Sequence, residues 1–195
     1  MIVVVGRPLL APGPVGPVAG GLASLIAVAC VSAGAAVELV GTIGDDAGGD
    51  AVAVDLARSG IGHAALLRIA AVPTASTDGA SGPGPRLEAR DLDLGLRYVA
   101  DFRVLVAAEP LTPDLEAVII EAAAYAGAAV VAIAAGDGAV GNALADSATV
   151  FEAPSEALGP FAEMIGRYAA ALDAGVPPGA AFAAAARGAG WEPAG

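Results

Sequence analysis

The fold is decided by the stretch Gly20-Gly21-Leu22-Ala23-Ser24-Leu25, an alanine-rich run to Gly34, and Val37-Glu38-Leu39-Val40-Gly41-Thr42-Ile43-Gly44-Asp45-Asp46-Ala47-Gly48-Gly49-Asp50. A glycine pair here precedes a run of small residues with helical character, and an apolar strand then leads into a Gly-Asp-Asp turn. A second helical pattern follows, ends at Ser59-Gly60-Ile61, and is succeeded by Pro73-Thr74. The fixed order of these pieces indicates a strand between two helices.

The rest of the chain continues this alternation of short β-branched runs with longer helical patterns. Continuous apolar runs are typical of strands buried on both faces, and strands are expected at Ile2–Val5, Val37–Ile43, Ala64–Ile69, Phe102–Ala107, Ala129–Ile133 and Thr149–Phe151. Helices are expected at Gly21–Ala33, Ala47–Ser59, Pro113–Ala126, Glu156–Ala174 and Pro178–Arg187. This alternation predicts an α/β fold, a three-layer doubly wound structure with a mostly parallel sheet.

Two segments interrupt the alternation. Residues 7–19 are rich in Pro and Gly, and residues 75–96 mix Gly and Pro with charged residues. Both compositions are typical of loops, and both segments are predicted to be loops. Because a length of 195 residues suits one domain, we expect residues 1–195 to form a single domain.

The composition excludes several classes of function. Lys is absent, and nine Arg against 21 acidic residues give a net charge of −12, which argues against binding to nucleic acid or anionic membranes. Without Lys, neither a Lys-based P-loop nor Schiff-base chemistry is available. Cys30 and His63 are the only residues of their kinds, so no internal disulfide forms and no metal site of the Cys/His type is expected.

The expected location of the protein follows from its first 38 residues. No charge lies between Arg7 and Glu38, so this run must be tested as a membrane span. Four prolines fill its first half and the remainder is weakly hydrophobic, so a buried helix containing a structural Cys30 is the better interpretation. The start of the chain is strand-like and has no basic region, which argues against a signal peptide. We expect a cytoplasmic protein.

The stretch from Gly20 to Pro73 resembles the ribokinase-like family, also called PfkB carbohydrate kinases. In that family a Gly-Gly pair opens a helix, a Gly-Ala closes it, and the next strand delivers a Gly-x-x-Gly-Asp-Asp-x-x-Gly turn. A Gly-Ile step and a Pro-Thr follow, matched here by Gly60-Ile61 and Pro73-Thr74. The resemblance implies a ribokinase-like fold and phosphoryl transfer from ATP, with Mg2+, to a hydroxyl of a sugar or nucleoside.

The same resemblance implies that parts of the enzyme are reduced. In ribokinase-like enzymes the places of residues 7–19 and 75–96 carry the strands of a lid, so these segments are loops or a vestigial lid. Between the positions of Pro154 and Gly159 the family has further strands and helices, including much of its nucleotide-binding wall. This chain has only a few residues there. Truncation of this kind is expected to leave apolar surface uncovered, and we expect a homodimer.

The catalytic element of the family is also altered. A Gly-Ala-Gly-Asp element there supplies a catalytic aspartate and an anion hole at a helix N-terminus. Its best counterpart is Gly159-Pro160-Phe161-Ala162, which would place the anion hole or nucleotide contacts at Gly159, Phe161 and Ala162. Alanine cannot accept a proton, and Pro160 removes one amide donor. Glu163 is either a substitute catalytic base or simply a favourable acid near the start of a helix.

The predicted substrate site has changed as well. The asparagine that follows the glycine pair in the family falls on Leu25, which cannot order a hydroxyl. Gly20 and Gly21 either allow close approach of a ligand or form the tight start of a helix. Asp45 and Asp46 either contact substrate or cap the next helix.

Two functions therefore stay open. The first is residual kinase activity on a small hydroxylated substrate, with Glu163 as base and with ATP and Mg2+. The second is a non-catalytic protein on the same scaffold, without a cofactor, that binds a small molecule or takes part in an assembly. The second explains Ala162, Leu25 and the shortened segments together.

Overall fold

The computed structural model describes residues 1–99, 101–136 and 138–188. Six strands form one sheet in the order β5-β4-β1-β6-β7-β8, and every neighbouring pair is parallel. They are β1 (Ile2–Val5), β4 (Val37–Gly44), β5 (Leu66–Ile69), β6 (Val104–Ala107), β7 (Ala129–Ala135) and β8 (Ala148–Ala153). All six strands expected from the sequence are confirmed, with shifts at their ends.

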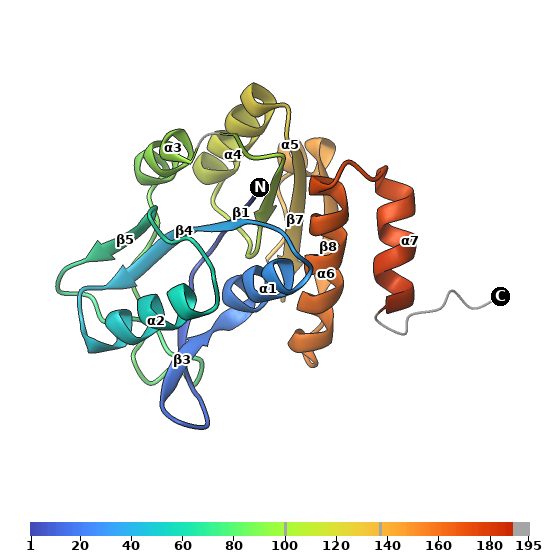
Figure 1. The fold of residues 1–195 in the computed structure, drawn as a ribbon. Coiled ribbons are helices and arrows are strands. Elements are labelled where there is room, and N and C mark those ends of the chain that lie inside the picture. The colour runs from blue at the N-terminus through green and yellow to red at the C-terminus, as the bar shows by residue number, and fades with distance from the viewer. Residues whose placement is uncertain (100, 137, 189–195) are drawn as a thin grey trace.

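Helices cover both faces of the sheet (Figure 1). They are α1 (Gly21–Ser32), α2 (Ala47–Arg58), α3 (Ala89–Tyr98), α4 (Pro113–Ala126), α5 (Asn142–Ser147), α6 (Leu158–Asp173) and α7 (Pro178–Gly188). Helices α1, α2, α6 and α7 share one hydrophobic core, and α3, α4 and α5 share the other. The predicted three-layer α/β architecture is confirmed.

Strand β1 shows how the sequence builds these layers. All four of its residues are 0% exposed, and successive side chains of a strand point to opposite faces. Ile2 and Val4 join the core beneath α1 and α6, whereas Val3 and Val5 join the core beneath α3 and α4. An unbroken apolar run therefore serves two cores, which places β1 at the centre of the sheet.

The prediction of a loop at residues 7–19 is wrong. Strands β2 (Leu9–Pro12) and β3 (Pro17–Gly20) form a two-stranded antiparallel hairpin beside the main sheet. Pro12 and Pro17 face each other where the strands meet the turn, a position at which a missing N–H is tolerated. The hairpin continues into residues 75–77, because the Leu10 N–H donates to the Ala75 carbonyl at 2.8 Å.

The prediction of a loop at residues 75–96 is also wrong in its last third, where α3 begins at Ala89. The many charged residues of this segment made its helical pattern hard to recognise in the sequence. Leu92 and Leu96 lie four residues apart and are buried, while Asp93 and Arg97 pair on the exposed face at 2.9 Å. The short helix α5 was not expected either, and helix α6 begins at Leu158 instead of Glu156.

The first 38 residues hold a buried helix, as predicted. Within the part of the chain that the structure describes, no helix is long and apolar enough to cross a membrane. Cys30 on α1 is 0% exposed. Burial, and secondarily the nearby carboxylate of Asp173, raise the pKa of its thiol to about 12, so Cys30 is protonated and structural at neutral pH.

Candidate functional site

The carboxyl ends of β1 and β6 form the switch point of the sheet. From β1 the chain order runs through β4 to β5 on one side and through β6 and β7 to β8 on the other. Open α/β sheets bind ligands outside the carboxyl ends of their strands at such a point. Arg7 follows β1 and Glu109 follows β6, so both lie at this edge.

Arg7 and Glu109 bind each other there. The Arg7 Nε and Nη2 atoms both lie 3.2 Å from Glu109 Oε2, and the Arg7 backbone N–H donates to Glu109 Oε1 at 3.0 Å. Arg7 Nη1 also donates to the Pro83 carbonyl at 2.7 Å, and Thr42 Oγ1 donates to the Pro85 carbonyl at 2.9 Å. The polar groups at the switch point are thus engaged with the chain itself, and they hold the segment 75–88 over the edge.

Sequence reasoning missed this pair. Its position in the sequence could have revealed it, because residues that directly follow two adjacent parallel strands lie close together at the same edge of the sheet. Arg7 follows the first strand after one residue, and no aspartate lies between Arg7 and Leu10. An Arg–Glu pair at that place supplies no free carboxylate for a sugar hydroxyl.

Replacing Arg7 with alanine should loosen segment 75–88. The expected loss of stability is about 1 kcal/mol, because the pair is only partly buried, but the lost bond to the Pro83 carbonyl should raise backbone hydrogen exchange across residues 75–88. Arg97→Ala is the control, since Arg97 pairs with Asp93 on an exposed helical face. Unchanged exchange in Arg7→Ala would show that the segment is held by other contacts.

The glycine pair starts helix α1 beneath the hairpin. Gly20 is the N-cap residue, and Gly21 has φ of 78°, a conformation that favours glycine. A Cβ atom on Gly20 would lie 2.6 Å from the Ala11 side chain, and one on Gly21 would lie 2.8 Å from the Leu9 side chain. The pair therefore forms the tight start of a helix under β2, and contact with a ligand remains a proposal.

Asp46 and Asp45 have different surroundings. Asp46 caps α2: Oδ1 accepts from the Gly49 N–H and from the Thr74 hydroxyl, both at 2.7 Å, and Oδ2 accepts from the Thr74 N–H at 2.9 Å. The hydrogen bond from the Thr74 hydroxyl, with the two backbone bonds, lowers the Asp46 pKa below its ordinary value. Asp45 is 63% exposed and lies 3.8 Å from Arg68. Capping is thus carried by Asp46, whereas Asp45 is accessible to solvent.

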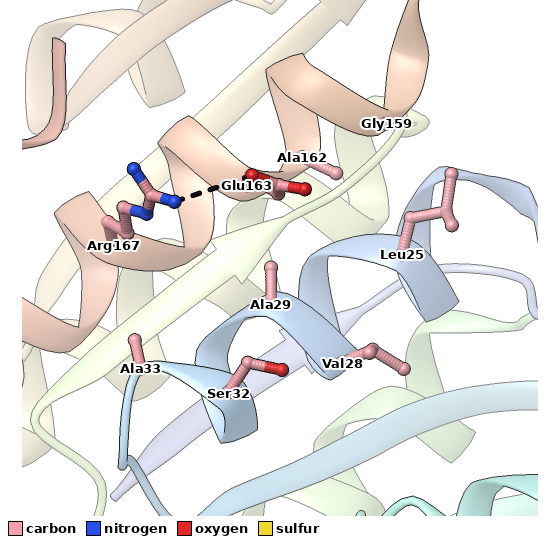
Figure 2. A pocket seen from close by; sticks show the side chains of 9 residues that line it. All are labelled: Leu25, Val28, Ala29, Ser32, Ala33, Gly159, Ala162, Glu163 and Arg167. Atoms are coloured by element: carbon pink, nitrogen blue, oxygen red, sulfur yellow. Dashed lines mark hydrogen bonds and ion pairs between the residues drawn. The ribbon is translucent and has the colours of Figure 1, made fainter. Parts of the chain in front are cut away.

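Helices α1 and α6 pack side by side and form a groove (Figure 2). The groove has a volume of about 410 Å³. It is lined by Leu25, Val28, Ala29, Ser32, Ala33, Gly159, Ala162, Glu163 and Arg167. The structure therefore brings together Leu25 and Ala162 from helices more than a hundred residues apart in sequence. These are the residues that the resemblance in sequence aligned with the family's asparagine and aspartate.

The chemistry of this groove is poor in proton acceptors. Ala162 is 1% exposed and Phe161 is 2% exposed, and both belong to the core shared with α1. Glu163 is 64% exposed and pairs with Arg167 one turn later on α6 at 3.4 Å. Among the described residues, no cluster of His, Cys, Asp and Glu could hold a metal ion.

The N-terminus of α6, where the resemblance implies an anion hole, offers few backbone amides. Ala157 precedes the helix with φ of 59° and provides no side-chain cap. Pro160 has no N–H, so one of the amides that a helix start normally leaves free is missing, while the Phe161 N–H makes the usual first intrahelical bond to the Ala157 carbonyl at 3.4 Å. Fewer amides are therefore available to a phosphate than a helix N-terminus normally offers.

Solved structures resemble this chain over most of its length. Arabidopsis thaliana ribokinase complexed with ribose and ATP has a TM-score of 0.67 at 15% identity and covers 96% of this chain and 90% of its own. Aminoimidazole riboside kinase from Salmonella enterica has a TM-score of 0.66 at 15% identity, with coverages of 96% and 90%. A PfkB protein from Polaromonas sp. JS666 has a TM-score of 0.65 at 15% identity, with coverages of 96% and 94%.

The comparisons by sequence are negative. No protein-family model matches the chain, and no curated protein matches it. The similarity of structure nevertheless confirms the predicted ribokinase-like fold, and at this identity it shows the fold alone.

Proposed function

We propose that this chain, which has the ribokinase-like fold, has weak or no phosphotransferase activity and works as a small-molecule-binding or assembly protein. The observation that carries the proposal is Ala162. The resemblance aligns Ala162 with the family's catalytic aspartate, and this residue cannot accept a proton and is 1% exposed. Transfer to a hydroxyl needs a positioned base, so loss of this group removes a central part of the chemistry.

Two further features support the proposal. Leu25 lines the same groove as Ala162, so both ends of the expected reaction site are apolar. At the switch point, the Arg7 guanidinium and the Glu109 carboxylate bind each other instead of leaving polar groups for a substrate. A site rebuilt in this way favours retention of the scaffold over retention of catalysis.

A second candidate function is residual kinase activity. It is favoured by Glu163, a carboxylate that lies in the groove beside Ala162 and is accessible to solvent. Glu163 would act as the base, Gly159, Phe161 and Ala162 would contact phosphate, and ATP with Mg2+ would be required. The substrate would be a sugar or nucleoside held near Gly20, Gly21 and Asp45. For both candidate functions we propose a cytoplasmic location and a single domain that spans residues 1–195.

Thermal-shift measurements with ATP, ADP, sugars and nucleosides, with and without Mg2+, separate the two functions when combined with an assay for ADP release. A ligand at a hundred times its dissociation constant stabilises the native state by about 2.7 kcal/mol. We expect at most weak turnover, with the same rate in the wild type and in Glu163→Gln. ADP release that depends on a sugar and is abolished by Glu163→Gln would establish the kinase instead. Glu121→Gln on α4 is a control for removal of a carboxylate.

A further inference from the structure

Strand β8 ends the sheet with an open edge. It pairs with β7 in parallel register from Val130–Ala148 to Ala135–Ala153. Across residues 1–99, 101–136 and 138–188, no strand or loop forms a backbone hydrogen bond with the other side of β8. On that side the backbone N–H and C=O groups therefore have no backbone partner among the described residues, and a further β-strand is the partner that satisfies such a row.

The sequence of β8 lacks the usual protections of an edge strand. Ala148-Thr149-Val150-Phe151-Glu152-Ala153 contains no Pro and no basic residue, and its one charge is Glu152. Val150 is 41% exposed. The opposite edge differs, because β5 has four residues and Arg68 at its centre pairs with Asp50 at 2.8 Å. Edge strands are normally shortened, charged or interrupted, so β8 is the edge suited to pairing.

Aromatic side chains support β8 from behind. The Phe151 ring lies 5.3 Å from the Tyr168 ring on α6 and 6.0 Å from the Phe182 ring on α7. The Tyr168 hydroxyl also donates to Thr149 Oγ1 at 3.3 Å. Helices α6 and α7 thus hold the strand in an extended form before any partner arrives, which lowers the entropic cost of adding a strand.

We propose that β8 pairs antiparallel with β8 of a second copy around a two-fold axis, joining two six-stranded sheets into one. An edge that binds its own copy must be self-complementary. The side chains of directly opposed residues in an antiparallel pair point to the same face of the sheet. A two-fold axis perpendicular to the sheet therefore requires that one residue of β8 lies directly opposite its own copy.

The register centred on Val150 satisfies the chemistry best. It places Val150 opposite Val150, Thr149 opposite Phe151, and Ala148 opposite Glu152. Pairs of an aromatic with a β-branched residue stabilise antiparallel sheets, and the two carboxylates do not face each other. A register centred on Phe151 would instead place Val150 opposite Glu152. The inference is independent of the proposed function, because neither the groove nor the switch point takes part.

Sedimentation equilibrium and a disulfide test examine the inference directly. The wild type should dimerise, and Val150→Arg should weaken the dimer by at least tenfold, because it sets two cations opposite each other. Val54→Arg on α2 is the matched control, since Val54 is 47% exposed and lies away from β8. Each copy carries a charge of −12, so measurements belong at about 0.15 M salt or more, where repulsion is screened.

The disulfide test fixes the register. In Val150→Cys, mild oxidation should link the two copies, whereas Val54→Cys should stay unlinked. Cys30 does not compete, because it is buried. A wild type that is monomeric at roughly millimolar concentration, a dimer that Val150→Arg leaves unchanged, or the absence of a linked Val150→Cys dimer would overturn the proposal. Circular dichroism of each variant separates failure to dimerise from failure to fold.

Discussion

Replacing Gly166 with alanine is expected to lower the free energy of unfolding by about 1–3 kcal/mol, the usual cost of overpacking a core. Gly166 lies on the face of α6 that packs against α1, and its neighbours are close. A Cβ atom at this position would lie 2.5 Å from the Ala29 Cβ, 2.7 Å from the Ala29 carbonyl carbon and 2.8 Å from the Cys30 nitrogen. Two of these are backbone atoms, so the helices themselves must move apart.

Gly159→Ala is the matched control on the same helix. A Cβ atom on Gly159 would meet nothing within 4 Å. Alanine favours a helix over glycine by about 1 kcal/mol, so Gly159→Ala should leave stability unchanged or raise it. Urea unfolding followed by circular dichroism measures both variants. Equal stabilities of Gly166→Ala and Gly159→Ala would mean that α1 and α6 are not in close contact. The groove between the two helices would then differ from the one described above.

Much of the fold was predictable because its signals are local. Strand β1 is a continuous apolar run, and such a run is required of a strand buried on both faces. Helix α4 was predicted with its observed bounds, since Pro113 suits the first turn and Gly127 ends the helix with φ of 63°. Neither element depends on knowing what packs against it.

The elements that were missed depend on tertiary contacts. Pro and Gly in residues 7–19 fit a loop equally well, and β2 becomes a strand because it pairs with β3 and bonds to residues 75–77. Helix α3 has only two buried residues, Leu92 and Leu96, among many charges. The sequence of one segment does not show which face of that segment other parts of the chain will cover.

The candidate site was predictable from the sequence only in part. The resemblance singled out Leu25 and Ala162 as altered positions, and both line one groove, but the expected substrate contacts Gly20, Gly21 and Asp45 do not line it. It could not show that Arg7 and Glu109 bind each other at the switch point, or that Gly166 sets the distance between α1 and α6. Those features depend on how distant segments meet, so only the assembled structure reveals them.

Replacing Asp46 with alanine is expected to cost about 2–3 kcal/mol of stability, the sum of a lost helix cap and lost hydrogen bonds to a charged group. The carboxylate joins the start of α2 to Thr74, and the Thr74 hydroxyl also donates to Asp46 while accepting from the Gly44 N–H at 3.0 Å. Thr74 is 2% exposed, so water cannot replace the lost partner. Asp45→Ala, which removes an exposed neighbour 3.8 Å from Arg68, should change stability by less than about 0.5 kcal/mol.

The contribution of Asp46 should also depend on pH. Hydrogen bonding to Thr74 lowers its pKa in the folded protein below the ordinary value of 3.8, so the native state binds a proton less readily than the unfolded chain. Its stabilising effect is therefore complete above about pH 4 and is lost as the pH falls through the folded pKa. The difference in stability between wild type and Asp46→Asn should be largest near neutral pH and shrink below pH 4. A difference that stays constant down to acid pH would show that shape and not charge is what the cap requires.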